Sequence, residues 1–140
     1  MLDITDAMVF SFLWRDTPPI RVFQSIAAGL LGRPAFEGGG ATAMLGGVIH
    51  FFNAFSIVTV YHVAASRISA LTRRPVPCGL AYGVAVFLFM YYVVLPLSAL
   101  NARPPYPWPT MVNGVLIHAL AVGLPAALFA RAALTPAEPP

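Results

Sequence analysis

The feature that most constrains this chain is a run of 29 residues without a formal charge, residues 38–66, which lies between Glu37 and Arg67. A helix needs about 20 predominantly apolar residues to cross the hydrocarbon core of a bilayer. Charged residues make up 9% of the chain, whereas soluble domains contain about 25%. A water-soluble surface could not be built from so little charge, so the sequence indicates an integral membrane protein.

Four apolar segments are expected to span the membrane as helices. The first is short, because at about 1.5 Å per residue it covers roughly 20 Å of a hydrocarbon core that is about 30 Å thick. A further apolar piece between the first two spans is too short to cross and fits an interfacial or re-entrant helix. The expected spans are residues 2–14, 41–66, 79–100 and 111–130, and the interfacial helix is residues 19–31.

The predicted fold is therefore an all-α membrane helix bundle, with residues 1–134 as one domain and residues 135–140 as a disordered tail. Pro96 is expected to kink the third span, because proline removes a backbone hydrogen bond from a helix. Arg67, Arg73 and Arg74 flank a short loop between the second and third spans. Their clustering favours a cytoplasmic position for that loop.

Two histidines of the second span are candidate functional residues, because an unpaired polar group in hydrocarbon costs several kcal/mol. His50 shares a helical stripe with Gly46, Gly47 and Ala54, and small residues at such spacing let a second helix approach closely. His50 is therefore expected to face protein. His62 lies close to Arg67 and is expected near the headgroups, hydrogen-bonded or reaching towards water.

The remaining polar candidates lie at the ends of spans or within them. Glu37 is expected to pair with Arg33 or Arg21 at the surface, or to sit at a membrane-edge site. The acidic residues of the first span are expected to mark a hydrated helix start, where the macrodipole favours carboxylates. The full set of polar membrane candidates is Asp3, Asp6, Glu37, Asn53, His62 and Asn113.

The second and fourth spans carry a similar order of residues, Met44, Gly47 and His50 against Met111, Gly114 and His118. The match is explained either by an internal duplication or by chance similarity. Parallel helices would place the two histidines at similar depth, where a facing pair of imidazoles is able to hold haem b as axial ligands. Histidines with a purely structural role, and a proton or ion path through the acidic residues and histidines, are the alternatives.

Other kinds of chemistry find little support in the sequence. Three scattered histidines and one cysteine, Cys78, do not form a usual metal-ligand set. The nucleophile-elbow, Walker A and zincin motifs are absent from the sequence, so no enzymatic activity is expected. The net charge of +3 resides in scattered arginines rather than in a basic stripe, so nucleic acid is not an expected partner.

Several phrases of the chain resemble a group of small bacterial inner-membrane proteins that have four predicted spans and no assigned activity. The phrases are QSIAAGLLGRPAFEGGG (residues 24–40), VVLPLS (residues 93–98) and VGLPAAL (residues 122–128), together with His50 in its span. The resemblance covers most of the chain and implies a fold and a location without a mechanism. Because all eight basic residues are arginine, the composition also fits a GC-rich bacterial genome.

The sequence thus predicts a multi-pass protein of the bacterial inner membrane with a non-enzymatic role as a scaffold or accessory subunit. Its expected partners are the lipid bilayer and either further copies of itself or a larger membrane complex. The scaffold role requires a stripe of small residues that stays outward-facing after internal packing. The rivals are an electron-transfer protein that binds haem b or another pigment through His50 and His118, and a small transporter lined by Asp3, Asp6, Asn53 and Asn113.

Overall fold

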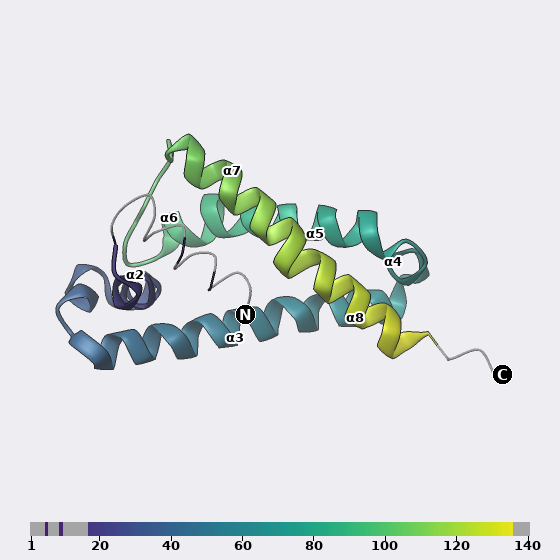
Figure 1. Cartoon of the computed structure of the whole chain (residues 1–140), viewed down its shortest axis with the longest axis horizontal. Coiled ribbons are helices and arrows are strands. Elements are labelled where there is room, and N and C mark those ends of the chain that lie inside the picture. The colour runs from purple at the N-terminus through teal and green to yellow at the C-terminus, as the bar shows by residue number, and fades with distance from the viewer. Residues whose placement is uncertain (1–4, 6–8, 10–16, 136–140) are drawn as a thin grey trace. The chain divides into compact units, whose positions relative to one another are not determined.

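The computed structural model describes Thr5, Val9 and residues 17–135 (Figure 1). The described residues form helices and contain no strand. Three helices are long and apolar enough to cross a membrane: Gly39–Arg67, Pro75–Leu97 and Trp108–Leu134. These findings confirm the predicted all-α fold. The predicted first span, residues 2–14, and the predicted tail, residues 135–140, lie outside the described residues except for Thr5, Val9 and Thr135.

The helices Gly39–Arg67 and Trp108–Leu134 extend beyond the ranges expected for spans two and four at both ends, whereas Pro75–Leu97 begins before and ends before the range expected for span three. Two of them begin further upstream at sites rich in proline, because proline suits the first turn of a helix, where its missing N–H leaves no bond unmade. The stretch expected to be a loop after Arg67 contains a short helix instead. The elements in order are α2 (Pro19–Leu31), η1 (Arg33–Phe36), α3 (Gly39–Arg67), α4 (Ser69–Arg73), α5 (Pro75–Phe89), η2 (Met90–Val94), α6 (Leu95–Leu97), α7 (Trp108–Ile117), η3 (His118–Gly123) and α8 (Leu124–Leu134).

The chain divides into two compact units, and unit 1 comprises Met1–Ala54 and Leu88–Tyr106. In unit 1, α2 packs closely on α3, since a Cβ added at Gly46 would collide with the backbone of Phe23. Gln24 of α2 is 3% exposed, and its Nε2 donates to the Gly39 carbonyl at 3.0 Å. The short helix expected at residues 19–31 is thus α2, and a buried amide fixes it to the start of α3.

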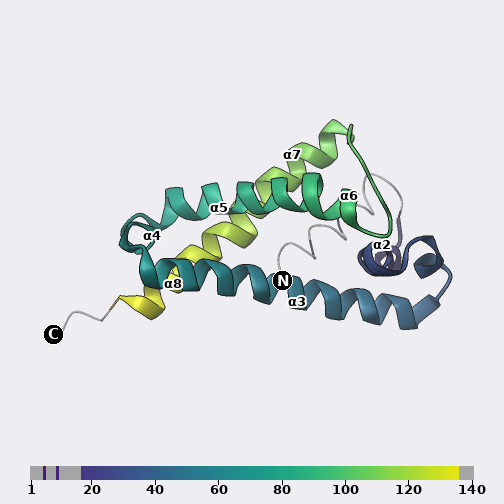
Figure 2. The ribbon, with the colours of Figure 1, turned by 180° about the vertical axis from the view of Figure 1, so that it is seen from behind.

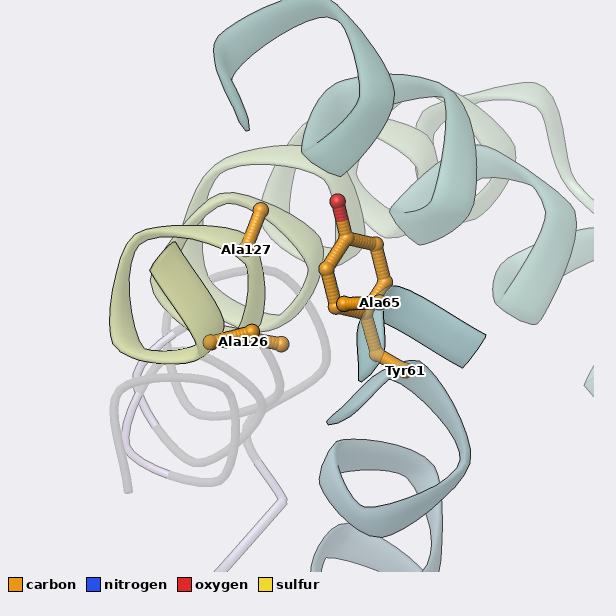
Figure 3. Close-up of a cluster of buried hydrophobic side chains, with 5 residues drawn as sticks. Tyr61, Ala65, Ala126 and Ala127 are labelled. Atoms are coloured by element: carbon orange, nitrogen blue, oxygen red, sulfur yellow. The ribbon is translucent and has the colours of Figure 1, made fainter. Parts of the chain in front are cut away.

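Unit 2 comprises Phe55–Phe87 and Pro107–Pro140, and its core lies between α3 and α8. Figure 3 shows Tyr61 and Ala65 of α3 facing Ala126 and Ala127 of α8. Tyr61 is only 2% exposed. Alanine on one helix and tyrosine on the other fill the same layer, which lets the two backbones approach while the aromatic ring supplies the buried area.

A second contact in unit 2 brings α5 against the helix formed by α7, η3 and α8. Gly79 and Gly83 of α5 meet Gly123, and a Cβ added at Gly83 would collide with the His118 carbonyl oxygen. Small residues permit such close backbone approach in membrane helices. The glycines of both helices therefore lie in this internal contact.

Prolines shape two of the long helices through a local widening of the backbone. The π-helical segment η2 ends two residues before Pro96, and the π-helical segment η3 ends two residues before Pro125. A proline ring collides with the carbonyl four residues earlier, and a π turn relieves that collision. The disturbance expected at Pro96 thus takes the form of a π segment.

Candidate functional site

His118 opens the π segment of unit 2 and makes a defined hydrogen bond. Its Nδ1 lies 2.8 Å from the Gly114 carbonyl oxygen, and because a carbonyl only accepts, Nδ1 carries the proton. Its ring also meets Phe87 edge-on, with centroids 5.4 Å apart. A histidine that donates from Nδ1 to a carbonyl presents Nε2 as the basic nitrogen, which is a common arrangement among metal-ligating histidines.

The other two histidines lie on α3. His50 belongs to unit 1, and its ring makes an edge contact with Phe51 at 5.8 Å. His50, Gly46 and Ala54 are all buried or half-buried, which agrees with a protein-facing stripe. Because His50 and His118 belong to different units, the haem pair stays a prediction.

His62 is half-buried on α3, and the expectation of a hydrogen-bonded or water-reaching ring stays a prediction. Its Nδ1 atom is buried without a hydrogen-bond partner among the described residues. The ring lies 6.3 Å from the Phe129 ring of α8. The side chain is therefore turned towards an aromatic neighbour, and the physical reason is that α8 covers this side of α3 within unit 2.

The remaining polar candidates are dispersed. Asp3 and Asp6 lie outside the described residues. Asn53 is half-buried on α3 in unit 1, and Asn113 is half-buried on α7 in unit 2. Glu37 is exposed. The proposed transporter path requires Asp3, Asp6, Asn53 and Asn113 together, so it stays a prediction.

Arginine contacts in unit 1 differ from the ion pairs that the sequence suggested. Arg21, one of the two expected partners of Glu37, donates to the Phe36 carbonyl at 2.8 Å. The same guanidinium lies 5.8 Å from the centre of the Phe36 ring. A cation held over an aromatic face and bonded to a carbonyl is satisfied without a carboxylate.

Two tyrosines link the helices of unit 2, and their hydrogen-bond partners could not be predicted from the sequence. The Tyr82 hydroxyl donates to the Ile57 carbonyl at 2.7 Å, and the Tyr61 hydroxyl donates to the Leu71 carbonyl at 3.4 Å. The two rings meet edge-on at 5.0 Å. Tyr82 is thus an internal tether between α5 and α3.

A third tyrosine serves the π segment of unit 1. Leu95 N–H donates to the Met90 carbonyl, and Pro96 has no N–H that could donate to the Tyr91 carbonyl. The Tyr106 hydroxyl lies 2.8 Å from that carbonyl oxygen and 2.9 Å from the Ala102 carbonyl oxygen, and it donates between them. Burial raises the pKa of the Tyr106 hydroxyl, and nearby Tyr92 adds to the rise.

The π segment of unit 2 creates the same deficit. Leu124 N–H donates to the Ala119 carbonyl, and Pro125 has no N–H that could donate to the Leu120 carbonyl. This turn therefore has one backbone donor fewer than a regular helix.

The outward side of α5 carries small residues as well. Ala81 and Ala85 are exposed, and each follows a buried glycine by two positions, about 200° round the helix. They are one turn apart and face away from the contact that Gly79 and Gly83 make. This pair, called the α5 outer stripe below, is the kind of leftover small-residue surface that the scaffold hypothesis requires.

No group of three or more histidine, cysteine, aspartate or glutamate residues suited to a metal ion occurs among the residues that the structure describes. The fold and these sites together define a multi-pass all-α membrane protein. No protein-family model, curated protein or solved structure matches the chain.

Proposed function

We propose that this chain is a non-enzymatic scaffold or accessory subunit of the bacterial inner membrane, which packs α5 against a helix of a larger membrane complex. The observation that carries the proposal is the α5 outer stripe, Ala81 and Ala85. Large apolar side chains on a membrane helix are satisfied by lipid, whereas small residues one turn apart allow another helix backbone to approach closely.

The low burial of the spans supports the same role. Within the most apolar part of α3, 6% of the residues are buried inside the chain, and the corresponding share for Pro75–Leu97 is 17%. Most of the apolar surface is thus available to lipid or to other helices.

The experiment compares the size of the complex that the tagged chain forms in native membranes. The Ala81→Leu/Ala85→Leu variant adds bulk to the α5 outer stripe, and Ala132→Leu/Ala133→Leu adds the same bulk at exposed positions of α8. After extraction in mild detergent, the parent chain and the α8 variant should elute as a complex larger than the isolated chain. The α5 variant should elute at the size of the isolated chain, and an unchanged elution of the α5 variant would reject the proposal.

A second candidate function, electron transfer through haem b held by His50 and His118, has one observation in its favour. The Nδ1–H of His118 donates to the Gly114 carbonyl, which leaves Nε2 as the nitrogen suited to ligation. An oxidised-minus-reduced absorption spectrum of the purified protein tests it. A haem band that disappears in both His50→Ala and His118→Ala supports this candidate, and a featureless spectrum removes it.

A further inference from the structure

Four arginines gather at one end of unit 2. Arg67 ends α3, Arg73 and Arg74 end and follow α4, and Arg131 lies in the last turn of α8. The short helix α4 packs against α8, and Figures 1 and 2 both place α4 beside the end of α3 and the end of α8. These four residues are called the arginine end below.

The arginine end has no internal counter-charge in the described part of unit 2. That part contains no aspartate or glutamate, and all four arginines are exposed. The guanidinium groups of these four arginines make no hydrogen bond or ion pair with another residue of the described part of the chain. In unit 1, by contrast, Arg21 is bonded to the Phe36 carbonyl and Arg103 donates to Asn101 at 3.0 Å.

The partial negative charges at the nearby helix C-termini balance only part of the positive charge of the arginine end. Arg67, Arg73 and Arg131 each lie in the last turn of a helix, where a C-terminus carries roughly half an elementary negative charge. Four full positive charges exceed that amount. The surplus has to be balanced from outside the described chain.

The apolar residues around α4 place this surplus at a membrane surface. Leu71 packs inward against the core cluster of unit 2, whereas Ile68 and Val76, on either side of α4, are 52% and 49% exposed. Outward apolar side chains that flank a short helix and lie next to arginines are typical of the boundary between acyl chains and headgroups. Guanidinium groups match the oxygens of a phosphodiester with paired hydrogen bonds.

We propose that the arginine end is a binding site for anionic phospholipid headgroups, which supply the missing negative charge at this face of the membrane. The site is independent of any protein partner, because it lies on α4 and the adjoining helix ends rather than on the α5 outer stripe.

The test titrates the full chain, purified in a neutral detergent, with short-chain phosphatidylglycerol and, separately, with phosphatidylcholine of the same chain length. Native mass spectrometry reports the fraction of protein that carries lipid. Phosphatidylglycerol should bind more tightly than phosphatidylcholine. Arg73→Gln/Arg74→Gln should weaken phosphatidylglycerol binding roughly 30-fold, since each surface arginine contributes about fivefold, and should leave phosphatidylcholine binding unchanged.

The matched control is Arg33→Gln/Arg103→Gln, which removes the same charge from unit 1 and should leave phosphatidylglycerol binding unchanged. A charge-preserving variant, Arg73→Lys/Arg74→Lys, should retain most of the binding. Equal binding of the two lipids by the parent chain would overturn the proposal, as would an equal loss in the control variant. Displacement of phosphatidylglycerol by equimolar glycerol phosphate would also overturn it, because the site would then recognise a soluble phosphate.

Discussion

The π segments of the two units have the same local cause and different surroundings. In unit 1, η2 precedes Pro96 and contains no buried residue, and the carbonyl freed at Tyr91 is taken by the Tyr106 hydroxyl. In unit 2, η3 precedes Pro125 and contains buried Ala119 and Gly123. There the widened turn lies in a glycine contact with α5, and Pro125 cannot donate to the Leu120 carbonyl.

This difference teaches that a proline removes one backbone N–H donor from a helix but does not determine which group replaces it. Unit 1 meets the need from its own chain, through a tyrosine in the segment that follows the helix. Unit 2 uses the π turn for close packing. In the proposed function, the α5 outer stripe is the feature that a partner helix would use.

The largest expected effect tests the packing role of unit 2. Gly83→Ala should destabilise the protein by about 3 kcal/mol, because the new Cβ would collide with the His118 carbonyl oxygen and overpacking of a tight contact costs energy on this scale. Thermal unfolding in mild detergent, followed by circular dichroism, measures the change.

Gly47→Ala in unit 1 is the matched control. Its new Cβ would meet only Phe23 ring atoms at 3.9 Å, so the better helix propensity of alanine should stabilise the protein by up to about 1 kcal/mol. Equal destabilisation by both variants would mean that the close contact at Gly83 is not what distinguishes unit 2.

The next effect tests the polar tether of unit 1. Tyr106→Phe keeps the ring contacts but leaves the Tyr91 carbonyl without its donor, which should cost about 2 kcal/mol. The same thermal unfolding measurement applies. A loss below about 0.5 kcal/mol would show that water replaces the hydroxyl without penalty.

A smaller effect links the tether to the proline. Pro96→Ala restores an N–H to the helix that carries the Tyr91 carbonyl, so in the Tyr106→Phe background it should recover about 1 kcal/mol. Pro125→Ala in the same background should show no such coupling, because Pro125 lies in unit 2. Identical coupling energies for the two prolines in a double-mutant cycle would contradict the assignment.

The smallest effect is a pH dependence at Tyr106. Since its pKa is raised in the folded chain, the hydroxyl stabilises the fold fully below the ordinary tyrosine pKa of about 10, and this contribution is lost as the pH rises through the raised value. The difference in unfolding temperature between the parent chain and Tyr106→Phe should stay constant from pH 7 to about 9 and shrink above about 10. A difference that grows with pH would contradict the neutral hydroxyl as donor.

The helices could be predicted from the sequence, whereas the hydrogen bonds that link one helix to another could not. The charge-free run between Glu37 and Arg67 defines α3 because helix length and bilayer thickness are linked, and Pro96 marks a local backbone disturbance. The bond from Tyr106 to Tyr91 joins residues 15 apart, and that from Tyr82 to Ile57 joins residues 25 apart. Such pairs depend on how helices pack, which apolar spans with little amphipathic pattern do not encode locally.

The candidate sites divide in the same way. A protein-facing stripe around His50 follows from helical spacing alone, and the burial of Gly46 agrees with it. The proton position on His118 depends on the Gly114 carbonyl, a neighbour that only the folded helix identifies as its acceptor. The α5 outer stripe is visible only after Gly79 and Gly83 are known to face inward, because every position of an apolar helix looks alike in the sequence.

The central claim, that a partner helix covers the α5 outer stripe in the native membrane, is tested most directly by photo-crosslinking. A benzophenone amino acid is placed at Ala85, and for comparison at Leu97, which is 82% exposed. Irradiation of intact membranes should give a discrete protein adduct from position 85 and lipid adducts from position 97. Lipid adducts alone from both positions would contradict the claim and leave α5 as a helix that faces lipid.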